Sequence, residues 1–387
     1  MSEIRVAIVG LGNCASSLIQ GIHYYHEAFA DQTNGTVGLS HPVLGDYVPG
    51  DIRIVAAIDI DRRKVGLPIH EAVFAPPNNT KVFYDRFRYD GVRVAMGNVL
   101  DGVPEHMKAY PEHQRFVAAD RPAPTSADIE RLLSDTGAEI LMNYLPVGSQ
   151  KAAEFYAECC LNTGVSLINC IPVFIVSDAA WAQRFRRAGI PCVGDDVKAQ
   201  VGATIVHRVL SRLMCQRGAK IDATYQINTG GNTDFLNMLN QARLGSKRIS
   251  KTEAVQSQLD EPLPAEQLYI GPADFVPWQK DNKVCFLRIE GRGFGGVPLN
   301  LELRLSVEDS PNSAGETIDA IRCCRLARDR GLAGPLEAVC AYTMKHPPVQ
   351  YNDDLARQML EDFIAGNGEG SYVPGDRTAA HRGISAE

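Results

Sequence analysis

The 387-residue sequence predicts an α/β fold, a doubly wound parallel sheet with an inserted α+β domain. Two observations lead to this prediction. Over about the first 200 residues, short apolar runs alternate with stretches of helical periodicity, as in a parallel sheet covered on both faces. Between about Cys215 and Val307 the apolar runs become longer and alternate with polar residues, which is typical of antiparallel strands.

The expected elements of the first part are short. Strands are expected at residues 5–9, 52–58, 139–144, 165–169 and 191–194, with helices from 15 onward, at 150–162 and at 202–213. A stretch rich in Gly, Asn, Asp and Pro at 28–50 is expected to be a loop inserted before the second strand.

The second part changes character and then returns. Strands are expected at 223–228, 266–270, 283–290 and 297–307, in a largely antiparallel sheet. A helix at 312–330, with Asp309 and Ser310 as candidate caps and Gly331 after it, is expected to rejoin the first domain. The second domain is therefore predicted to be an insertion.

Composition limits the class of protein. With 45% hydrophobic and 22% charged residues, the chain has the balance of a globular protein of about two domains. Its net charge of -7 is spread along the chain, which argues against nucleic acid or an anionic membrane as a partner. No apolar run approaches the ~18 residues of a membrane span. None of the ten cysteines forms a C-x-x-C pair, so we expect reduced, mostly buried thiols and a cytoplasmic location.

A glycine-rich turn carries the cofactor prediction. The segment Gly10-Leu11-Gly12-Asn13-Cys14-Ala15 matches the G-x-G-x-x-G/A fingerprint of Rossmann-like domains, between an expected strand and an expected helix. Asp59 ends the second expected strand, where an acidic residue hydrogen-bonds the ribose of NAD, although it comes later than the usual ~20 residues. The alternative is a glycine turn that binds nothing.

The choice between NAD and NADP depends on the charges near Asp59. Its carboxylate favours NAD because it would repel a 2′-phosphate, and the basic run Arg62-Arg63-Lys64 weakens that preference. Further cofactor contacts are expected where later strands end, at Pro146, Gly148, Ser149, Asp195 and Asp196.

Lysines beside small polar residues are the second set of candidates. They are Lys198, Lys247, Lys251, Lys283 and Lys345, each of which, taken singly, fits a solvated surface lysine. Lys247 and Lys251 are four residues apart and would repel each other on one helix face unless an anion lay between them, which indicates a phosphate site. The segment 228–234, NTGGNTD, suits either a polar ligand or a simple Asn-Gly loop.

Together these segments resemble the inositol-phosphate synthase family, in its shorter prokaryotic type. They cover residues 4–365 in the order of the family. The residues that carry the likeness are GLGNCASSL from Gly10, NYLPVGS from Asn143, VGDDVKAQVGAT from Val193, NTGGNTDFLNM from Asn228, SKRISKTEAV from Ser246, EDSPNSAG from Glu308 and YTMKHPP from Tyr342.

The resemblance implies an NAD-dependent, redox-neutral isomerisation of glucose 6-phosphate to an inositol monophosphate. Carbon 5 gives up a hydride, carbon 6 then loses a proton, and the enolate attacks the aldehyde at carbon 1 before the hydride returns. Cations placed in advance would stabilise the enolate and the aldol oxyanion. The substrate phosphate is an alternative acceptor of the carbon 6 proton.

The resemblance also implies residue roles. The catalytic set is Lys247, Lys251, Lys283, Lys345, Asp196, Asp234 and Asp309. Lys247 and Lys345 are expected to stabilise oxyanions and relay protons, whereas Lys251 and Lys283 mainly hold phosphate. Substrate contacts are also expected from Lys198, Gln200, Thr204 and Asn232. Ala199 stands where the family commonly has a phosphate-binding serine, so a hydrogen bond worth about 1 kcal/mol is expected to be missing unless Gln200, Thr204 or backbone amides replace it.

Domain limits and assembly follow from the same reasoning. We expect an NAD-binding domain at 1–200 plus 310–365, an inserted catalytic and tetramerisation domain at 201–309, and a disordered tail at 366–387. The resemblance suggests a homotetramer. No metal is established, because the nine histidines show no zinc spacing, but a divalent or monovalent cation stays open.

Two other functions remain. A net dehydrogenase of a phosphorylated small molecule would use the same nucleotide-binding half and release NADH, and a non-catalytic NAD-binding protein would have no need of the lysines. Whether the product feeds phospholipid, osmolyte or thiol synthesis is not decided by the sequence.

Overall fold

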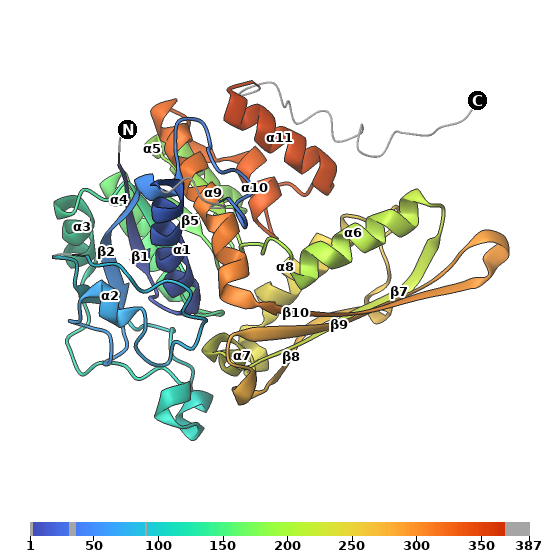
Figure 1. Ribbon diagram of the computed structural model, residues 1–387, viewed down its shortest axis with the longest axis horizontal. Coiled ribbons are helices and arrows are strands. Elements are labelled where there is room, and N and C mark those ends of the chain that lie inside the picture. The colour runs from blue at the N-terminus through green and yellow to red at the C-terminus, as the bar shows by residue number, and fades with distance from the viewer. Residues whose placement is uncertain (1–2, 31–35, 90, 368–387) are drawn as a thin grey trace.

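The computed structural model describes residues 3–30, 36–89 and 91–367 (Figure 1). A parallel sheet surrounded by helices forms one part of the molecule, and a long four-stranded sheet extends away from it. The prediction of a disordered tail concerns 366–387, of which 368–387 lie outside the described residues.

The first sheet is parallel and, among the described residues, has seven strands. They are β1 (Ile4–Val9), β2 (Ile52–Asp59), β3 (Val94–Met96), β4 (Ile140–Asn143), β5 (Ser166–Asn169), β6 (Pro191–Gly194) and β11 (Gly334–Pro335). Their spatial order is β11-β6-β5-β4-β1-β2-β3, which contains the Rossmann order 3-2-1-4-5-6. The predicted fold class is therefore confirmed.

Helices cover both faces of this sheet, so its strands read as nearly continuous apolar runs. The helices are α1 (Asn13–Ala30), α2 (Ile69–Ala72), α3 (Ser126–Asp135), α4 (Gln150–Thr163), α5 (Ala179–Ala188), α9 (Asp309–Asp329), α10 (Glu337–Thr343) and α11 (Asp353–Ala365). α1 packs against α9, although nearly the whole chain separates them in sequence (Figure 1). Local signals fix several helix ends: the Thr125 side chain caps α3, and Gly164 and Gly189 end α4 and α5 in left-handed conformation.

The strand order reverses between β1 and β4. The chain leaves β1 toward β2 on one side of the sheet and later enters β4 on the other side. Loops at the carboxyl ends of these two strands therefore diverge and leave a crevice, which is where open α/β sheets bind ligands.

The second sheet is mixed. Its strands are β7 (Lys220–Gly230), β8 (Leu268–Phe275), β9 (Asn282–Arg292) and β10 (Pro298–Glu308), in the order β10-β9-β7-β8. β9 pairs antiparallel with both neighbours, whereas β7 and β8 are parallel. Helices α6 (Ala203–Gln216) and α8 (Gly245–Gln256) cover one face, and α7 (Thr233–Asn237) lies at the end nearest the first sheet (Figure 1). The largely antiparallel sheet predicted here is confirmed, with one parallel pair as an exception.

Element boundaries differ from the predictions in a few places. β8 begins at Leu268 and runs to Phe275, later and longer than the predicted 266–270. The helix predicted at 312–330 spans Asp309–Asp329, so Asp309 and Ser310 lie in its first turn and Glu308 is its N-cap residue. The short strands β3 and β11 were not predicted, because strands of two or three residues carry no periodicity.

Among the described residues, no helix is long and apolar enough to cross a membrane. All ten cysteines are free thiols, and eight of them are buried, as predicted.

Candidate active site

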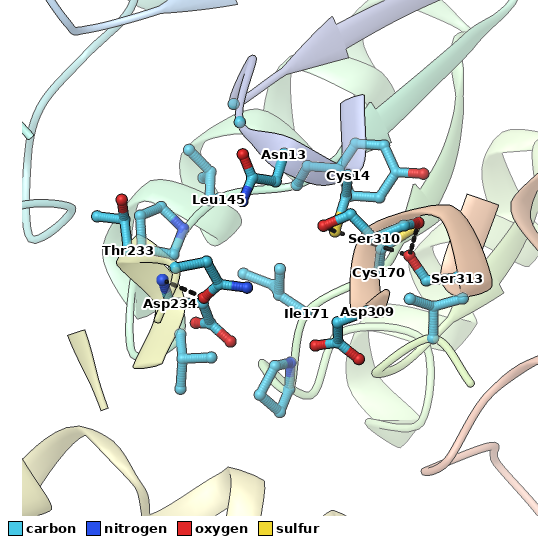
Figure 2. Close-up of a pocket in the computed structure, with 18 of the residues that line it drawn as sticks. Asn13, Cys14, Leu145, Cys170, Ile171, Thr233, Asp234, Asp309, Ser310 and Ser313 are labelled. Carbon is cyan, nitrogen blue, oxygen red and sulfur yellow. Dashed lines mark hydrogen bonds between the residues drawn. The ribbon is translucent and has the colours of Figure 1, made fainter. Parts of the chain in front are cut away.

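A cavity opens at the switch point of the first sheet and extends to the near end of the second (Figure 2). The glycine turn and the ends of β2 and β4 form one wall, and α7, α8, β9 and the start of α9 form the other. In Figure 2, Asn13 and Cys14 lie above Asp234 of α7 and Asp309 of α9. The predicted site residues that line it are Gly10, Gly12, Asn13, Cys14, Asp59, Pro146, Asp196, Lys198, Thr204, Asn232, Asp234, Lys247, Lys251, Lys283, Asp309 and Lys345.

The glycine turn leaves room for a ligand. Gly10 has φ +87°, and a Cβ there would lie 2.6 Å from the Tyr144 carbonyl oxygen, so the turn needs glycine. A Cβ on Gly12 would meet no atom within 4 Å, which leaves open space at the start of α1. Helix N-termini favour anions because their first amides are unpaired and the helix dipole is positive there. Ala15 is fully buried behind the turn and does not line the cavity.

Asp59 ends β2 as predicted and lies at the cavity wall. One of its carboxylate oxygens, Oδ2, accepts a hydrogen bond from the Leu11 amide at 2.8 Å, and Oδ1 accepts from the amides of Ile60 and Asp61 at 2.7 and 2.8 Å. The carboxylate therefore holds the glycine turn against the end of β2. Lys64 is buried, with its Nζ 3.8 Å from Asp59 Oδ2.

The arginines after Asp59 are engaged elsewhere. Arg62 pairs with Glu112 at 2.6 Å, and Arg63 pairs with Asp61 at 2.6 Å. Lys64 donates to the Leu11 carbonyl oxygen at 2.7 Å. The basic run is thus committed to partners within the protein.

Two residues predicted to bind cofactor lie against an arginine. Gly148 and Ser149 do not line the cavity. Arg243 Nη2 donates to Ser149 Oγ at 3.3 Å, and a Cβ on Gly148, whose φ is +82°, would lie 2.7 Å from Arg243 Cβ. Arg243 also donates to the carbonyl oxygens of Val147, at 2.9 Å, and Asp101, at 2.8 Å. No signal in the sequence distinguished this arginine.

Adjacent aspartates at the end of β6 point in opposite directions. Asp195 is fully buried away from the cavity and accepts hydrogen bonds from Asn169 Nδ2 at 2.7 Å and from Ser177 Oγ at 2.7 Å. Burial nevertheless raises the pKa of Asp195 to about 6. Asp196, with φ +62°, faces the cavity. Asp195 therefore fixes a loop, and the prediction that it contacts cofactor has no support in its position.

Three lysine–aspartate pairs surround the cavity. Lys247 Nζ lies 3.1 Å from Asp234 Oδ2, and Lys283 Nζ lies 3.1 Å from Asp309 Oδ1. The third pair joins Lys345 to Asp196 at 3.0 Å. The pairs come from α7 and α8, from β9 and α9, and from the loops after α10 and β6. The predicted catalytic lysines and aspartates are thus brought together from distant segments.

Mutual attraction favours the charged forms of Asp309, Asp196 and Lys247. Burial raises the pKa of Asp309, but Lys283, Lys345 and Lys247 outweigh it and hold the pKa below the usual range. The same competition lowers the pKa of Asp196, where Lys345 and Lys247 outweigh burial. For Lys247, burial opposes the charged form, but its carboxylate neighbours outweigh that effect and raise the pKa.

Lys251 differs from the other three lysines. It is 4% exposed and lines the cavity on α8. Within the described part of the chain, no hydrogen bond or ion pair reaches its ammonium group. Burial, then Lys247, Lys283 and Lys345, hold its pKa well below the usual value, against the opposing effect of Asp196.

The predicted substrate contacts are placed unevenly. Thr204, in the first turn of α6, lines the cavity. Lys198 also lines it, but its Nζ donates to the Ala341 carbonyl oxygen at 2.7 Å, and burial lowers its pKa to about 7. Gln200 is turned away from the cavity and donates to the Gly38 carbonyl oxygen at 2.8 Å. Gln200 therefore does not replace a hydrogen bond that Ala199 lacks.

Asp281 joins four segments beside the cavity and was not predicted. It is 1% exposed, and its Oδ1 accepts hydrogen bonds from Asn13 Nδ2 at 3.0 Å, Asn232 Nδ2 at 2.9 Å and Ser310 Oγ at 2.9 Å. Its Oδ2 accepts from Thr80 Oγ1 at 2.8 Å and from the Ser310 amide at 3.1 Å. In the sequence, only its neighbour Lys283 was a candidate. Within the described residues, no group of three His, Cys, Asp or Glu side chains could hold a metal ion.

The fold and the cavity define an α/β enzyme of the Rossmann-like class, with lysine–aspartate pairs around its ligand site. Residues 202–310 match the myo-inositol-1-phosphate synthase family model. The chain is 50% identical, over 94% of its length and 98% of the other protein, to the inositol-3-phosphate synthase of Mycolicibacterium smegmatis. It is therefore a member of the inositol-3-phosphate synthase family.

A second relative agrees with the family assignment, and a solved structure agrees with the fold. The inositol-3-phosphate synthase of Corynebacterium glutamicum is 48% identical over 94% of this chain and 98% of that protein. The crystal structure of a myo-inositol-1-phosphate synthase-related protein from Thermotoga maritima has a TM-score of 0.77 at 22% identity, covering 94% of this chain and 98% of that one, and has the same fold. The resemblance seen in the sequence is confirmed.

Proposed function

We propose that this protein converts glucose 6-phosphate to 1D-myo-inositol 3-phosphate with NAD as a cofactor that is reduced and reoxidised within each turnover. The observation that carries the proposal is the set of four lysines and three aspartates around one cavity beside the glycine turn. Membership of the inositol-3-phosphate synthase family supports it.

The residues at the switch point fit NAD. The open space at Gly12 and the first turn of α1 suit a pyrophosphate, and Asp59 suits an adenosine ribose. Bound NAD would accept the hydride of carbon 5 and return it. Because Arg62 and Arg63 are paired with carboxylates, no free guanidinium among them is left for a 2′-phosphate, which supports NAD over NADP.

The lysine–aspartate pairs suit charge that appears during the reaction. Lys247 and Lys345 would stabilise the enolate and the aldol oxyanion, and Asp234 and Asp196 orient the two ammonium groups. Because both ammonium groups are held before substrate enters, little reorganisation accompanies the reaction. Ser250 donates to Asp196 at 2.7 Å and fixes that carboxylate from α8.

The phosphate group would lie between Lys251, Lys283 and the start of α6. Gly202 is the N-cap residue of α6, and Thr204 follows in its first turn. Helix amides and the Thr204 hydroxyl are donors that a phosphate can use without a serine at position 199. This arrangement supports phosphate binding despite Ala199.

A product assay tests the proposal against the alternative of a net dehydrogenase of a phosphorylated small molecule. Purified protein is incubated with NAD and glucose 6-phosphate, the product is identified by NMR, and free NADH is followed by absorbance. Inositol phosphate without NADH accumulation is expected. Stoichiometric NADH would favour the dehydrogenase, and the absence of any product would overturn both.

Lys345→Ala is the matched variant for that assay. It removes one ammonium group and leaves Asp196 unpaired, so product formation should fall by a factor of about 10² or more. Lys151→Ala, on the exposed surface of α4, is the control and should match the unmodified protein. Equal activity of all three proteins would count against the lysine cluster as the reaction site.

Assembly as a cytoplasmic homotetramer through the inserted domain is part of the proposal. Tyr225, Tyr269 and Phe286 are exposed and, by strand register, share the face of the second sheet opposite α6 and α8. An exposed apolar face of this kind favours association with another copy. Whether the reaction needs a divalent or monovalent cation stays an open question, to be tested by assays with a chelator and with exchange of monovalent ions.

A further inference from the structure

Among the residues that the structure describes, three of the four candidate catalytic lysines around the cavity are paired with an aspartate and one is not. Asp234, Asp309 and Asp196 each pair with a single lysine at 3.0 to 3.1 Å. Together these three pairs carry no net charge. The fourth lysine is the exception, because within the described residues its Nζ has no carboxylate partner.

The surroundings of Lys251 disfavour a positive charge from several directions. Lys247 lies one turn earlier on α8, Lys283 approaches from β9, and Lys345 approaches from the loop after α10. Asp196, from the loop after β6, is the carboxylate that acts in favour of the charge, but it is already paired with Lys345. Other polar and titratable groups around this part of the cavity are Gln226 of β7, Ser250 of α8, Cys285 of β9, Asp309 of α9 and Lys198.

The physical result is an amine that is easily neutralised. Lys251 is nearly inaccessible to solvent, and burial of an unpaired ammonium group beside three other ammonium groups is costly. The pKa of Lys251 is accordingly lowered well below its usual value, first by burial and then by these neighbours. An ordinary surface lysine has no comparable penalty.

We propose that Lys251 is a neutral amine in the substrate-free enzyme and takes up one proton from solvent when a phosphate group enters the cavity. The proposal rests on the proposed function, because it concerns the phosphate of that substrate. The step is a proton transfer alone: a solvent proton binds the Nζ lone pair, the resulting ammonium contacts the phosphate dianion, and no bond of the substrate breaks. Phosphate binding is thereby coupled to proton uptake.

The coupling gives phosphate affinity a defined pH dependence. In the window between the lowered pKa of free Lys251 and the pKa of the phosphate-bound amine, binding needs one proton from solution. Affinity should therefore fall as pH rises, by up to about tenfold per pH unit. A lysine charged in both states would give no such slope from this group.

Calorimetry can count the protons. Protein loaded with NADH, which cannot accept a hydride from carbon 5, is titrated at pH 8 with glucitol 6-phosphate, which lacks the aldehyde needed for ring closure, in two buffers of different ionisation enthalpy. A phosphate monoester, with its second pKa near ~6, is already a dianion at this pH and has no proton to release. Inorganic sulfate, a dianion without a titratable proton in this range, is a second probe. Uptake of about one proton per bound anion is expected.

Two substitutions separate charge from proton uptake. Lys251→Arg supplies a permanently charged guanidinium, so it should bind the phosphate ester within about tenfold of the unmodified protein but take up almost no proton. Lys251→Met should lose proton uptake and weaken binding by about tenfold or more. Lys220→Met, at the exposed first residue of β7 and paired with Glu261, is the control and should leave both quantities unchanged.

The outcomes also separate this inference from the proposed function. Normal binding and product formation without proton uptake would overturn the inference alone, as would proton uptake that persists in Lys251→Arg. Failure to bind any phosphate ester, together with failure to form inositol phosphate, would overturn the proposed function instead.

Discussion

At the scale of single residues, Asp281 shows how one buried carboxylate can organise the site. It accepts five hydrogen bonds, all from donors on Asn13, Thr80, Asn232 and Ser310. Burial and the nearby Asp309 raise its pKa to about 6, so at pH 7 it is mostly ionised, as a group surrounded by donors requires. The carboxylate connects the glycine turn to the lysine-bearing segments.

Asp281→Asn should therefore weaken NAD binding far more than its small change in shape suggests. The amide NH₂ would face donors on at least one side, at a cost of about 1–3 kcal/mol for each group left unsatisfied. We expect NAD affinity to fall by about tenfold or more, measured by fluorescence titration. Asp260→Asn, whose carboxylate is exposed, is the control, and equal affinities for the two variants would contradict this role for Asp281.

A second prediction at this scale concerns pH. Burial, followed by the charge of Asp319, raises the pKa of Glu316 from 4.5 to about 7, which means that the folded state keeps a proton that the unfolded state releases. The sign follows directly: this contribution to stability is fully present below about pH 4.5 and is lost as pH rises toward 7.

Glu316→Gln should remove that loss, because a neutral amide resembles the protonated carboxyl group. Between pH 5 and 7 the free energy of unfolding of the unmodified protein should fall, relative to that of Glu316→Gln, by on the order of 2–3 kcal/mol at most, as measured by urea unfolding at both pH values. Glu266→Gln, at an exposed position just before β8, should keep the pH dependence of the unmodified protein. A Glu316→Gln variant with an unchanged pH dependence would refute the assignment.

At the scale of elements, the position of α8 relative to the first sheet decides where Lys247 and Lys251 lie. Arg243, just before α8, donates to Val147 and Ser149 in the loop after β4 and to Asp101 in the segment after β3, and so ties α8 to both. Apolar contacts of Val147 with Phe235, Met238 and Leu244 reinforce the connection.

Arg243→Ala should therefore lower kcat by about tenfold or more without unfolding the protein, because the lysines lose their position relative to the nicotinamide site. Added guanidinium should restore part of the activity, a result that a purely structural loss would not give. Gly148→Ala should lower kcat in the same way as Arg243→Ala, since the added Cβ would displace Arg243. Arg131→Ala, exposed on α3, is the control.

The elements also show what the sequence could and could not predict. β1, the glycine turn and α1 follow from local patterns, and so did the strand ending at Asp59. Gly148 and Ser149 were assigned to the cofactor because they follow a strand, but their partner Arg243 lies about 94 residues further along the chain. Asp195 and Asp196 look equivalent in sequence, but in the structure Asp196, whose backbone is left-handed, lines the cavity, whereas Asp195 is buried away from it.

At the scale of the whole molecule, the sequence pattern predicted two sheets and the return of the chain to the first one. Contacts across the gap between the sheets could not be predicted from it. Asp281 and Arg243 both bridge segments that only the folded chain brings together, so neither has a local signature. The cavity lysines were predicted through family motifs, whereas the pairing of three of them with particular aspartates required the structure.

The exposed face of the second sheet leads to a prediction about assembly. Phe286→Lys combined with Tyr269→Lys would place charges on the proposed contact between copies, so we expect the tetramer to dissociate, as measured by light scattering after size-exclusion chromatography. Tyr24→Lys, at an exposed position on α1, should leave the assembly intact. An unmodified protein that is monomeric would contradict the assembly proposal.

The central claim is that a hydride is borrowed from carbon 5 and returned to the same molecule within the lysine-lined cavity. Glucose 6-phosphate carrying deuterium at carbon 5 tests it most directly, with the product examined by NMR and mass spectrometry. The account predicts inositol phosphate that keeps the deuterium, with no free NADH. Product that has lost the label, or deuterated NADH released in proportion to consumed sugar, would contradict it.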